Sequence, residues 1–128
     1  MCRVFRLIDG VQHKDVQGVH PLMQHDCDKI CSLFENEKNY AIGIFGSSVT
    51  WGCSQTSDLD IAIRLFGDVS FERFSRMRNA ISRADLRAET DVLFFNDLKD
   101  TDPIKQEIHE DAYTLCYNVS DEFMVELQ

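Results

Sequence analysis

The sequence predicts an α/β (α+β) fold in which a small mixed β-sheet carries helices mainly on one face. Two apolar segments, residues 40–45 and 59–65, have the length and composition of strands. Apolar residues at helical spacing occur before and after them, over residues 21–35 and 70–84. Strands that alternate with helices are typical of a mixed sheet with helices packed against it.

The size and composition of the chain narrow the classes of protein to consider. We expect residues 1–128 to form a single domain, because 128 residues and a hydrophobic fraction of 44% suit one globular core. No apolar run approaches the length of a membrane span, and the first residues lack the long apolar stretch of a signal peptide. Five cysteines without framework spacing favour reduced thiols and a cytoplasmic location. The net charge of −9 disfavours a protein that grips long nucleic acid, but not one that binds a nucleotide delivered with Mg²⁺.

The N-terminal third holds one readable helix. Residues 1–20 are an N-terminal extension with two possible interpretations. It is either an added hairpin, with a strand near residues 4–8, or an arm that contacts a partner. The helix over 21–35 has Pro21 in its first turn. Within it Cys27 and Cys31 lie one turn apart, with His20 and His25 nearby, so a zinc site and a pair of buried thiols are alternatives. The helical spacing favours the buried thiols.

The elements after residue 65 follow in regular alternation. Ser70 can cap a helix to about residue 84, with Phe71, Phe74, Met77 and Ile81 on its inner face. Arginines on its outer side are either a basic patch for a partner or a solvated face: Arg73, Arg76, Arg78, Arg83 and Arg87. A strand over 90–95, a turn at 96–98, a helix over 103–110 and an edge-like strand over 112–117 follow, and a last amphipathic helix covers 121–127.

The stretch between residues 40 and 65 carries the candidate chemistry. The first strand ends at Gly46-Ser47, where a glycine lets backbone N–H groups approach a ligand and a serine can cap a following short helix that attracts phosphate. In the second strand Asp58 and Asp60 point to the same face, two residues apart. Two such carboxylates repel each other unless a cation lies between them, and oxygen ligands on a rigid strand suit Mg²⁺.

These residues, Gly46-Ser47, Gly52 and Ser57-Asp58-Leu59-Asp60, resemble the signature of the DNA polymerase β-type nucleotidyltransferase superfamily. The closest similarity is to its minimal nucleotidyltransferases (MNT), and it covers residues 21–117. The resemblance implies the nucleotidyltransferase fold and a third carboxylate on the strand after the second helix. Asp91 occupies that position, whereas Asp85 and Asp97 lie in turn-like contexts.

The resemblance also implies a function. Asp58, Asp60 and Asp91 would be catalytic and hold two Mg²⁺ ions, and Gly46, Ser47 and Ser57 would bind ATP. AMP would pass to a hydroxyl acceptor. A minimal domain of this kind is expected to borrow its acceptor from a second copy or from a partner. In the family the partner is a HEPN toxin, which is silenced when AMP is added to its tyrosine. The alternatives are nucleotidylation of a small molecule, such as an aminoglycoside-type antibiotic, and an antitoxin that acts by binding alone.

One segment departs from the family pattern. Many small members carry arginines between the glycine-serine pair and the next glycine, where this chain has Ser48-Val49-Thr50-Trp51. The motif is also similar to that of terminal uridylyl- and adenylyltransferases that act on RNA, which the acidic composition disfavours. Arg64, on the same strand face as Asp60, is either a phosphate or acceptor contact or a plain surface arginine.

Overall fold

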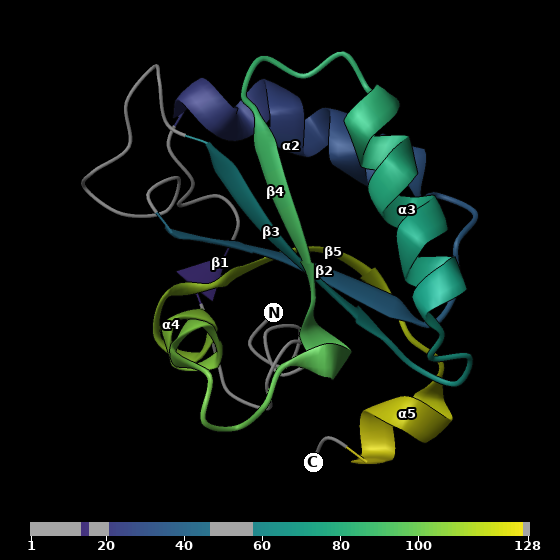
Figure 1. Ribbon diagram of the computed structural model, residues 1–128. Coiled ribbons are helices and arrows are strands. Elements are labelled where there is room, and N and C mark those ends of the chain that lie inside the picture. Colours follow the sequence, from purple (N-terminus) through teal and green to yellow (C-terminus); the bar gives the residue numbers. More distant parts are fainter. Residues whose placement is uncertain (1–13, 16–20, 47–57, 127–128) are drawn as a thin grey trace.

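The computed structural model of the chain describes residues 14–15, 21–46 and 58–126, and it confirms the predicted α/β fold (Figure 1). In the described part the strands form one five-stranded mixed sheet in the order β1-β5-β2-β3-β4. The strands are β1 (Lys14–Asp15), β2 (Tyr40–Phe45), β3 (Leu59–Leu65), β4 (Thr90–Phe94) and β5 (Tyr113–Asn118). The helices are α2 (Pro21–Leu33), α3 (Phe71–Arg83), the 3₁₀ turn η3 (Phe95–Asp97), α4 (Pro103–Asp111) and α5 (Asp121–Glu126).

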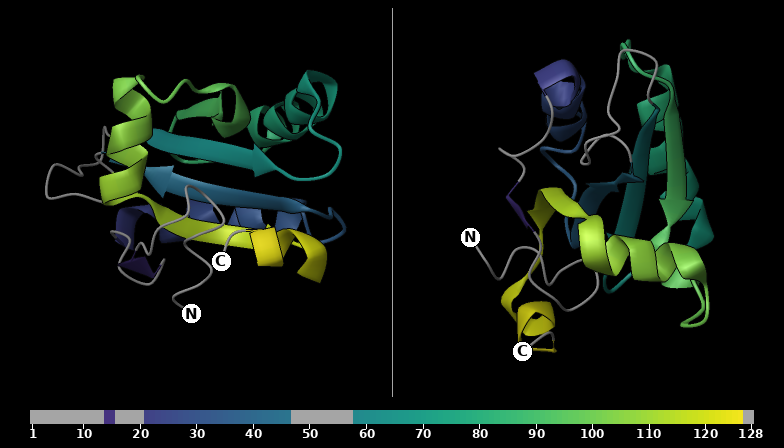
Figure 2. Two further views of the ribbon diagram at one scale, coloured as in Figure 1. Left: turned by 90° about the horizontal axis from the view of Figure 1, so that it is seen from below. Right: turned by 90° about the vertical axis from the view of Figure 1, so that its left-hand side faces the viewer.

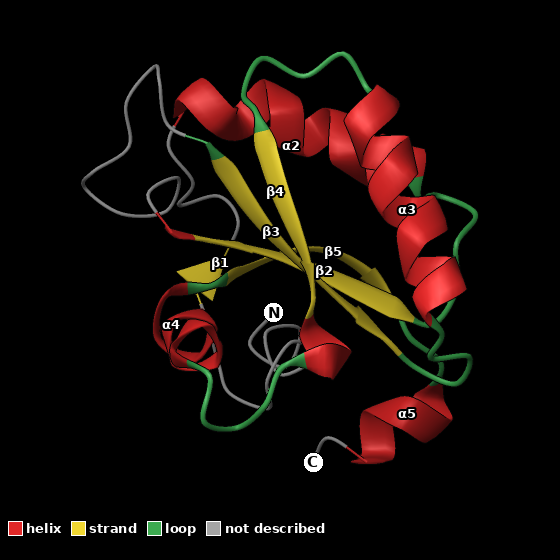
Figure 3. Cartoon of the chain, in the orientation of Figure 1, coloured by secondary structure: helices red, strands yellow, loops and turns green. Residues whose placement is uncertain are grey.

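The predicted elements that fall on described residues agree with this order to within about two residues, as Figure 3 lets the reader follow. The strand expected near residues 4–8 lies outside the described residues. Two of the predicted helix caps are present: the Ser70 side chain accepts from the Arg73 N–H, and Asp102 accepts from the Ile104 N–H ahead of Pro103. The edge position predicted for the strand over 112–117 is wrong. β5 pairs with β2 on one side and, in parallel, with the two-residue β1 on the other. No strand was predicted at the residues that form β1, so this neighbour of β5 was missed.

The register of the central strands decides what meets at each end of the sheet. β2 and β3 are antiparallel, with Phe45 opposite Asp60, and β3 and β4 are parallel, with Asp60 opposite Asp91. The end of β2 therefore lies beside the beginnings of β3 and β4. The opposite end of the sheet, near Tyr40 and Leu65, is the one at which α3 begins.

The larger part of the core lies between the sheet and helices α2 and α3, the two longest helices described. Inward residues of β2 and β3 alternate with outward ones, so Ile42, Ile44, Ile61 and Ile63 pack against this helical layer. From α3 the predicted inner residues Phe74, Met77 and Ile81 are buried. Phe71 was predicted with them and is 58% exposed, because it is the first residue of the helix and lies against Phe74 and Arg78 rather than the sheet.

A smaller cluster fills the other face of the sheet. Seen from below in Figure 2 (left), α4 and α5 lie in front of the strands while α2 and α3 lie behind them. Ile108 of α4 packs there with Ala41 and Phe45 of β2, and Phe123 of α5 lies against Phe66. Asp60 lies on the face of β3 that points toward α4, since it alternates with the inward Leu59 and Ile61.

Hydrogen bonds from side chains to backbone groups fix the connections on either side of β4. Asp26 of α2 is fully buried, and its carboxylate accepts hydrogen bonds from the backbone N–H groups of Arg87 and Ala88 at 2.8 and 2.9 Å. At the other end of β4, the Asn96 side chain both accepts from and donates to the backbone of Leu65, at 2.8 and 3.0 Å. These bonds hold both ends of β4 and so fix where Asp91 lies.

Candidate active site

Three aspartates predicted to be catalytic come together at one end of the sheet. Asp60 of β3 and Asp91 of β4 are direct register partners, so their side chains leave the same face on neighbouring strands. Asp58 immediately precedes β3 and is exposed, and it is two residues from Asp60 on the same side. Asp91 is paired within the sheet and its side chain is exposed at the edge strand, so its charge is accessible to a ligand.

The electrostatics of this group centre on Asp60. Burial is the largest cause that raises the pKa of Asp60, and with the negative charges of Asp91, Glu107 and Asp58, in that order, it brings that pKa to about 6. The carboxylate is therefore costly to ionise, because no positive group among the described residues contributes to its pKa. A cation between these oxygens would remove that cost, so the field favours metal binding here.

Gly46 brings the backbone against this group. Its φ is +77°, a left-handed conformation that glycine adopts without strain. A Cβ built on Gly46 would collide with Oδ2 of Asp60 and stand 3.2 Å from its Cγ. The turn that ends β2 therefore needs a glycine for two independent reasons, and it places the chain directly at the carboxylate.

The rest of the predicted nucleotide-binding loop lies outside the described residues. This holds for Ser47, Gly52 and Ser57, for the short helix expected after Ser47, and for the insert over 48–51. Asp85 and Asp97, the weaker candidates for the third carboxylate, are not register partners of Asp60. Asp97 follows the far end of β4 within η3, while Asp85 lies between α3 and β4, where its backbone oxygen accepts from Lys29.

The donor set fits Mg²⁺ that is shared with a nucleotide. Among the described residues, no group of three or more His, Cys, Asp or Glu side chains is arranged to hold a metal ion by itself. Mg²⁺ is commonly bound by one or two carboxylates, with phosphate oxygens and water completing its shell. Neighbouring Asp60 and Asp91, with Asp58 beside them, supply such carboxylates and no softer ligand.

The zinc alternative finds no support in these positions. Cys27 is buried in the core and the His25 side chain is 75% exposed, so the two residues lie on different sides of α2. His20 lies outside the described residues.

Two acidic residues with a bearing on the site were missed in the sequence. Glu107 of α4 contributes to the negative field at Asp60, although α4 is distant in sequence. Asp26 fixes the segment that leads into β4, as described above. The one signal in the sequence for Glu107 was that it precedes Ile108, which is buried against the sheet. No local pattern pointed to Asp26.

Arg64 lies on the same sheet face as Asp60, farther along β3. Its guanidinium stands 4.9 Å from the ring centroid of Phe66 and 5.5 Å from that of Phe95, and the Lys105 ammonium stands 5.3 Å from the Phe95 ring. These are cation–π contacts. Arg64 is thus held against aromatic rings on the face of the sheet that α4 covers, and this supports a structural role. A contact between Arg64 and phosphate or acceptor stays a prediction.

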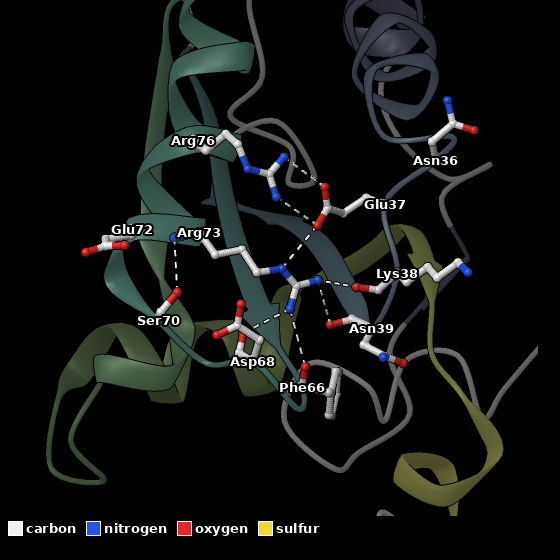
Figure 4. Close-up of a pocket in the computed structure, with 10 residues that line it drawn as sticks. All are labelled: Asn36, Glu37, Lys38, Asn39, Phe66, Asp68, Ser70, Glu72, Arg73 and Arg76. Atoms are coloured by element: carbon white, nitrogen blue, oxygen red, sulfur yellow. Dashed lines mark hydrogen bonds and ion pairs between the residues drawn. The ribbon is translucent and has the colours of Figure 1, made fainter.

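A pocket of about 680 Å³ opens at the opposite end of the sheet, where α3 begins (Figure 4). Its wall is organised by Arg73, which is 9% exposed and donates to the Glu37 carboxylate and to the backbone oxygens of Phe66 and Asp68, as well as those of Lys38 and Asn39. Arg76, 62% exposed, also pairs with Glu37. The placement of Arg73 in a solvated outer patch was therefore wrong, because a carboxylate and four carbonyls of neighbouring loops surround it. The pocket lies away from the aspartates, and its arginines are occupied in holding the chain together.

Comparison with known proteins identifies one family. The family model described as polymerase beta, nucleotidyltransferase matches residues 28–120, which span every aspartate of the site. A search of curated proteins gives no match. In the described part of the chain no helix is long and apolar enough to span a membrane.

Proposed function

The chain belongs to the polymerase beta nucleotidyltransferase family, and we propose that it transfers AMP from ATP to a hydroxyl acceptor with Mg²⁺ as its metal. One observation carries this proposal. Asp60 and Asp91 are register partners at the end of the sheet where Gly46 brings the backbone against the Asp60 carboxylate. Family membership supplies the reaction class, and this arrangement supplies carboxylates and a close-approaching backbone for a nucleotide.

The residues take distinct parts in the proposed transfer. Two Mg²⁺ ions, held by Asp58, Asp60 and Asp91, would neutralise phosphate charge and lower the pKa of the acceptor hydroxyl. Gly46 and Ser47 bind the β- and γ-phosphates, and Ser57 supports the nucleotide. Asp91, exposed at the sheet edge, takes the hydroxyl proton. The acceptor oxygen then forms a bond to the α-phosphorus while the bond to the bridging oxygen breaks and pyrophosphate leaves.

The proposed acceptor is a tyrosine of a HEPN toxin, which makes the chain the antitoxin of the pair. This step rests on the similarity of the Gly46-Ser47 and Ser57–Asp60 motif to the minimal nucleotidyltransferases. The net charge of −9 supports a protein acceptor over long nucleic acid, because a strongly acidic chain repels a polyphosphate backbone. A cytoplasmic location is part of the same proposal.

The test follows the label from ATP into a HEPN protein encoded beside this chain. With Mg²⁺ and ATP labelled in the α-phosphate, we expect label on the partner's tyrosine; ATP labelled in the γ-phosphate should leave none, because pyrophosphate departs. Chelation of the metal and the Asp60→Asn substitution should each abolish transfer. Asp97→Asn is the matched control, since Asp97 is an exposed acid at the far end of β4 and should leave transfer unchanged.

Other outcomes identify other functions. Neutralisation of the toxin without any label would overturn the proposed transfer and favour an antitoxin that acts by binding alone. Label found on an aminoglycoside but not on the partner would favour small-molecule modification. Asp60→Asn with wild-type transfer would remove Asp60 from the site.

A further inference from the structure

A pair of thiols joins α2 to β5 far from the aspartates. Cys31 of α2 and Cys116 of β5 are linked by a side-chain hydrogen bond, and the Cys31 thiol also contacts the backbone oxygen of Leu115 at 3.6 Å. Both residues are half-buried and pack against the main core. Two thiols within hydrogen-bonding distance, on elements distant in the chain, are positioned to react with each other.

The two sulfurs differ in the way that a reacting pair requires. The hydrogen bond from Cys116 lowers the pKa of Cys31 despite partial burial and the nearby Asp28. The same bond, together with burial, raises the pKa of Cys116. A thiolate is the nucleophile toward oxidants, so Cys31 is the member that reacts first and Cys116 the one that follows.

Cys27 provides an internal contrast on the same helix. It lies one turn before Cys31 and is 2% exposed. The pKa of Cys27 is raised to about 12, mainly by burial and then by the negative charges of Cys31, Asp26 and Asp28. A buried thiol that stays protonated is inert toward oxidants. The structure therefore separates one unreactive cysteine from a neighbouring reactive pair.

We propose that Cys31 and Cys116 form a redox modification site, at which a peroxide converts the two thiols to an intramolecular disulfide between α2 and β5. The Cys31 thiolate attacks one peroxide oxygen and the O–O bond breaks. The hydroxide that leaves takes up the proton that Cys31 released on ionising, so a sulfenic acid and one water result. Cys116 then attacks the Cys31 sulfur, the S–O bond breaks, and a second water leaves as the disulfide forms. Two thiols lose two electrons and hydrogen peroxide gains them, so atoms and charges balance.

The position of Cys116 gives the link a structural consequence. Cys116 stands opposite Ile42 of β2, directly before the register irregularity between Ile42 and Gly43. β2 is the strand that ends at Gly46. The disulfide would fasten α2 to the sheet beside that irregularity and restrict movement between β5 and the helix.

The sequence allows a direct map of the product. Trypsin places each of the five cysteines on a separate peptide: residues 1–3, 15–29, 30–38, 39–64 and 106–128. The reduced full-length chain is treated with equimolar hydrogen peroxide, alkylated in denaturant and digested without reductant. We expect one linked pair, 30–38 joined to 106–128, which disappears on reduction, while the peptide with Cys27 is recovered fully alkylated.

Two variants separate the steps. Cys116→Ser should stop the reaction at the Cys31 sulfenic acid, which dimedone traps. Cys27→Ser is the matched control and should still form the linked pair; the wild-type map stands even if that core substitution disturbs folding. Full alkylation of Cys31 and Cys116 after peroxide would overturn the proposal. So would a link from either residue to another cysteine, whether within one chain or in a covalent dimer on a non-reducing gel.

Discussion

Replacement of Gly46 by alanine tests how the end of β2 is built. Gly46 has a φ of +77°, and an added Cβ would collide with Oδ2 of Asp60. The substitution therefore strains the backbone and also displaces the carboxylate that lies beside Asp91. We expect Gly46→Ala to weaken both the fold and the binding of ATP with Mg²⁺.

Gly67 allows the two effects to be separated. It has nearly the same backbone conformation, with a φ of +72°, but its Cβ would stand 3.2 Å from Cζ of Phe123, the end of a side chain on α5. A left-handed alanine costs about 1–2 kcal/mol, which corresponds to a melting temperature lower by about 4–8 °C for a domain of this size. Both variants should show that loss, and Gly46→Ala should lose more because the displaced group is a charged side chain fixed on a strand.

The assay pairs urea unfolding with calorimetric titration of ATP in Mg²⁺. Gly67→Ala should bind within about twofold of wild type, whereas Gly46→Ala should bind at least about tenfold more weakly, equal to about 1.4 kcal/mol. Both titrations are made at a temperature where unfolding curves show each variant fully folded. Wild-type affinity in Gly46→Ala would refute the reasoning that this turn and Asp60 share one ligand site.

Three further predictions concern charge and stability. The pKa of Asp60 is raised from its ordinary 3.8 to about 6 in the folded state, so between these pH values the folded chain binds more protons than the unfolded chain. The free energy of unfolding of the metal-free protein should therefore fall as pH rises through 6, by about 1 kcal/mol after solvent screening. Asp60→Asn should not show this loss of stability. If the urea midpoints of wild type and variant change by the same amount between pH 4.5 and pH 7.5, this reasoning is contradicted. Asp26→Ala strands two backbone N–H groups and should cost about 3–5 kcal/mol, against less than about 0.5 kcal/mol for the exposed Asp28→Ala; equal unfolding midpoints would exclude a role for the Asp26 carboxylate. Arg73→Ala should cost about 3 kcal/mol because it removes a buried guanidinium with several acceptors, while the exposed Arg76→Ala should cost under about 1 kcal/mol; the reverse order in urea would show that the loops are not held by Arg73.

The sequence predicted the central elements well because their signals are local. Alternation over residues 59–65 and the apolar run over 40–45 specify strands, and Ser70 and Asp102 mark helix starts by their own side chains. The facing of Asp58 and Asp60 follows from the two-residue period of a strand. Their placement beside Asp91 came from family resemblance, because the register between β3 and β4 depends on packing of the whole sheet.

Apart from Phe71, whose exposure follows from its place at the start of α3, the errors and omissions involve partners distant in sequence. Arg73 has the spacing of an outer helical residue, yet Glu37 and the loop carbonyls approach it from another part of the chain. Glu107 and Asp26 act on the site only because α4 and α2 are brought to β3 and β4. No window of local sequence contains those relations, so periodicity cannot reveal them.

The most direct test of the nucleotide site is calorimetry of ATP binding with Mg²⁺ to the wild-type chain and to the Asp58→Asn, Asp60→Asn double variant. We predict binding that needs the metal in the wild type and is lost in the double variant, with both proteins unfolding at similar urea concentrations at low pH. Equal, metal-independent binding by the two proteins would contradict the account, because the aspartates would then have no part in holding the nucleotide.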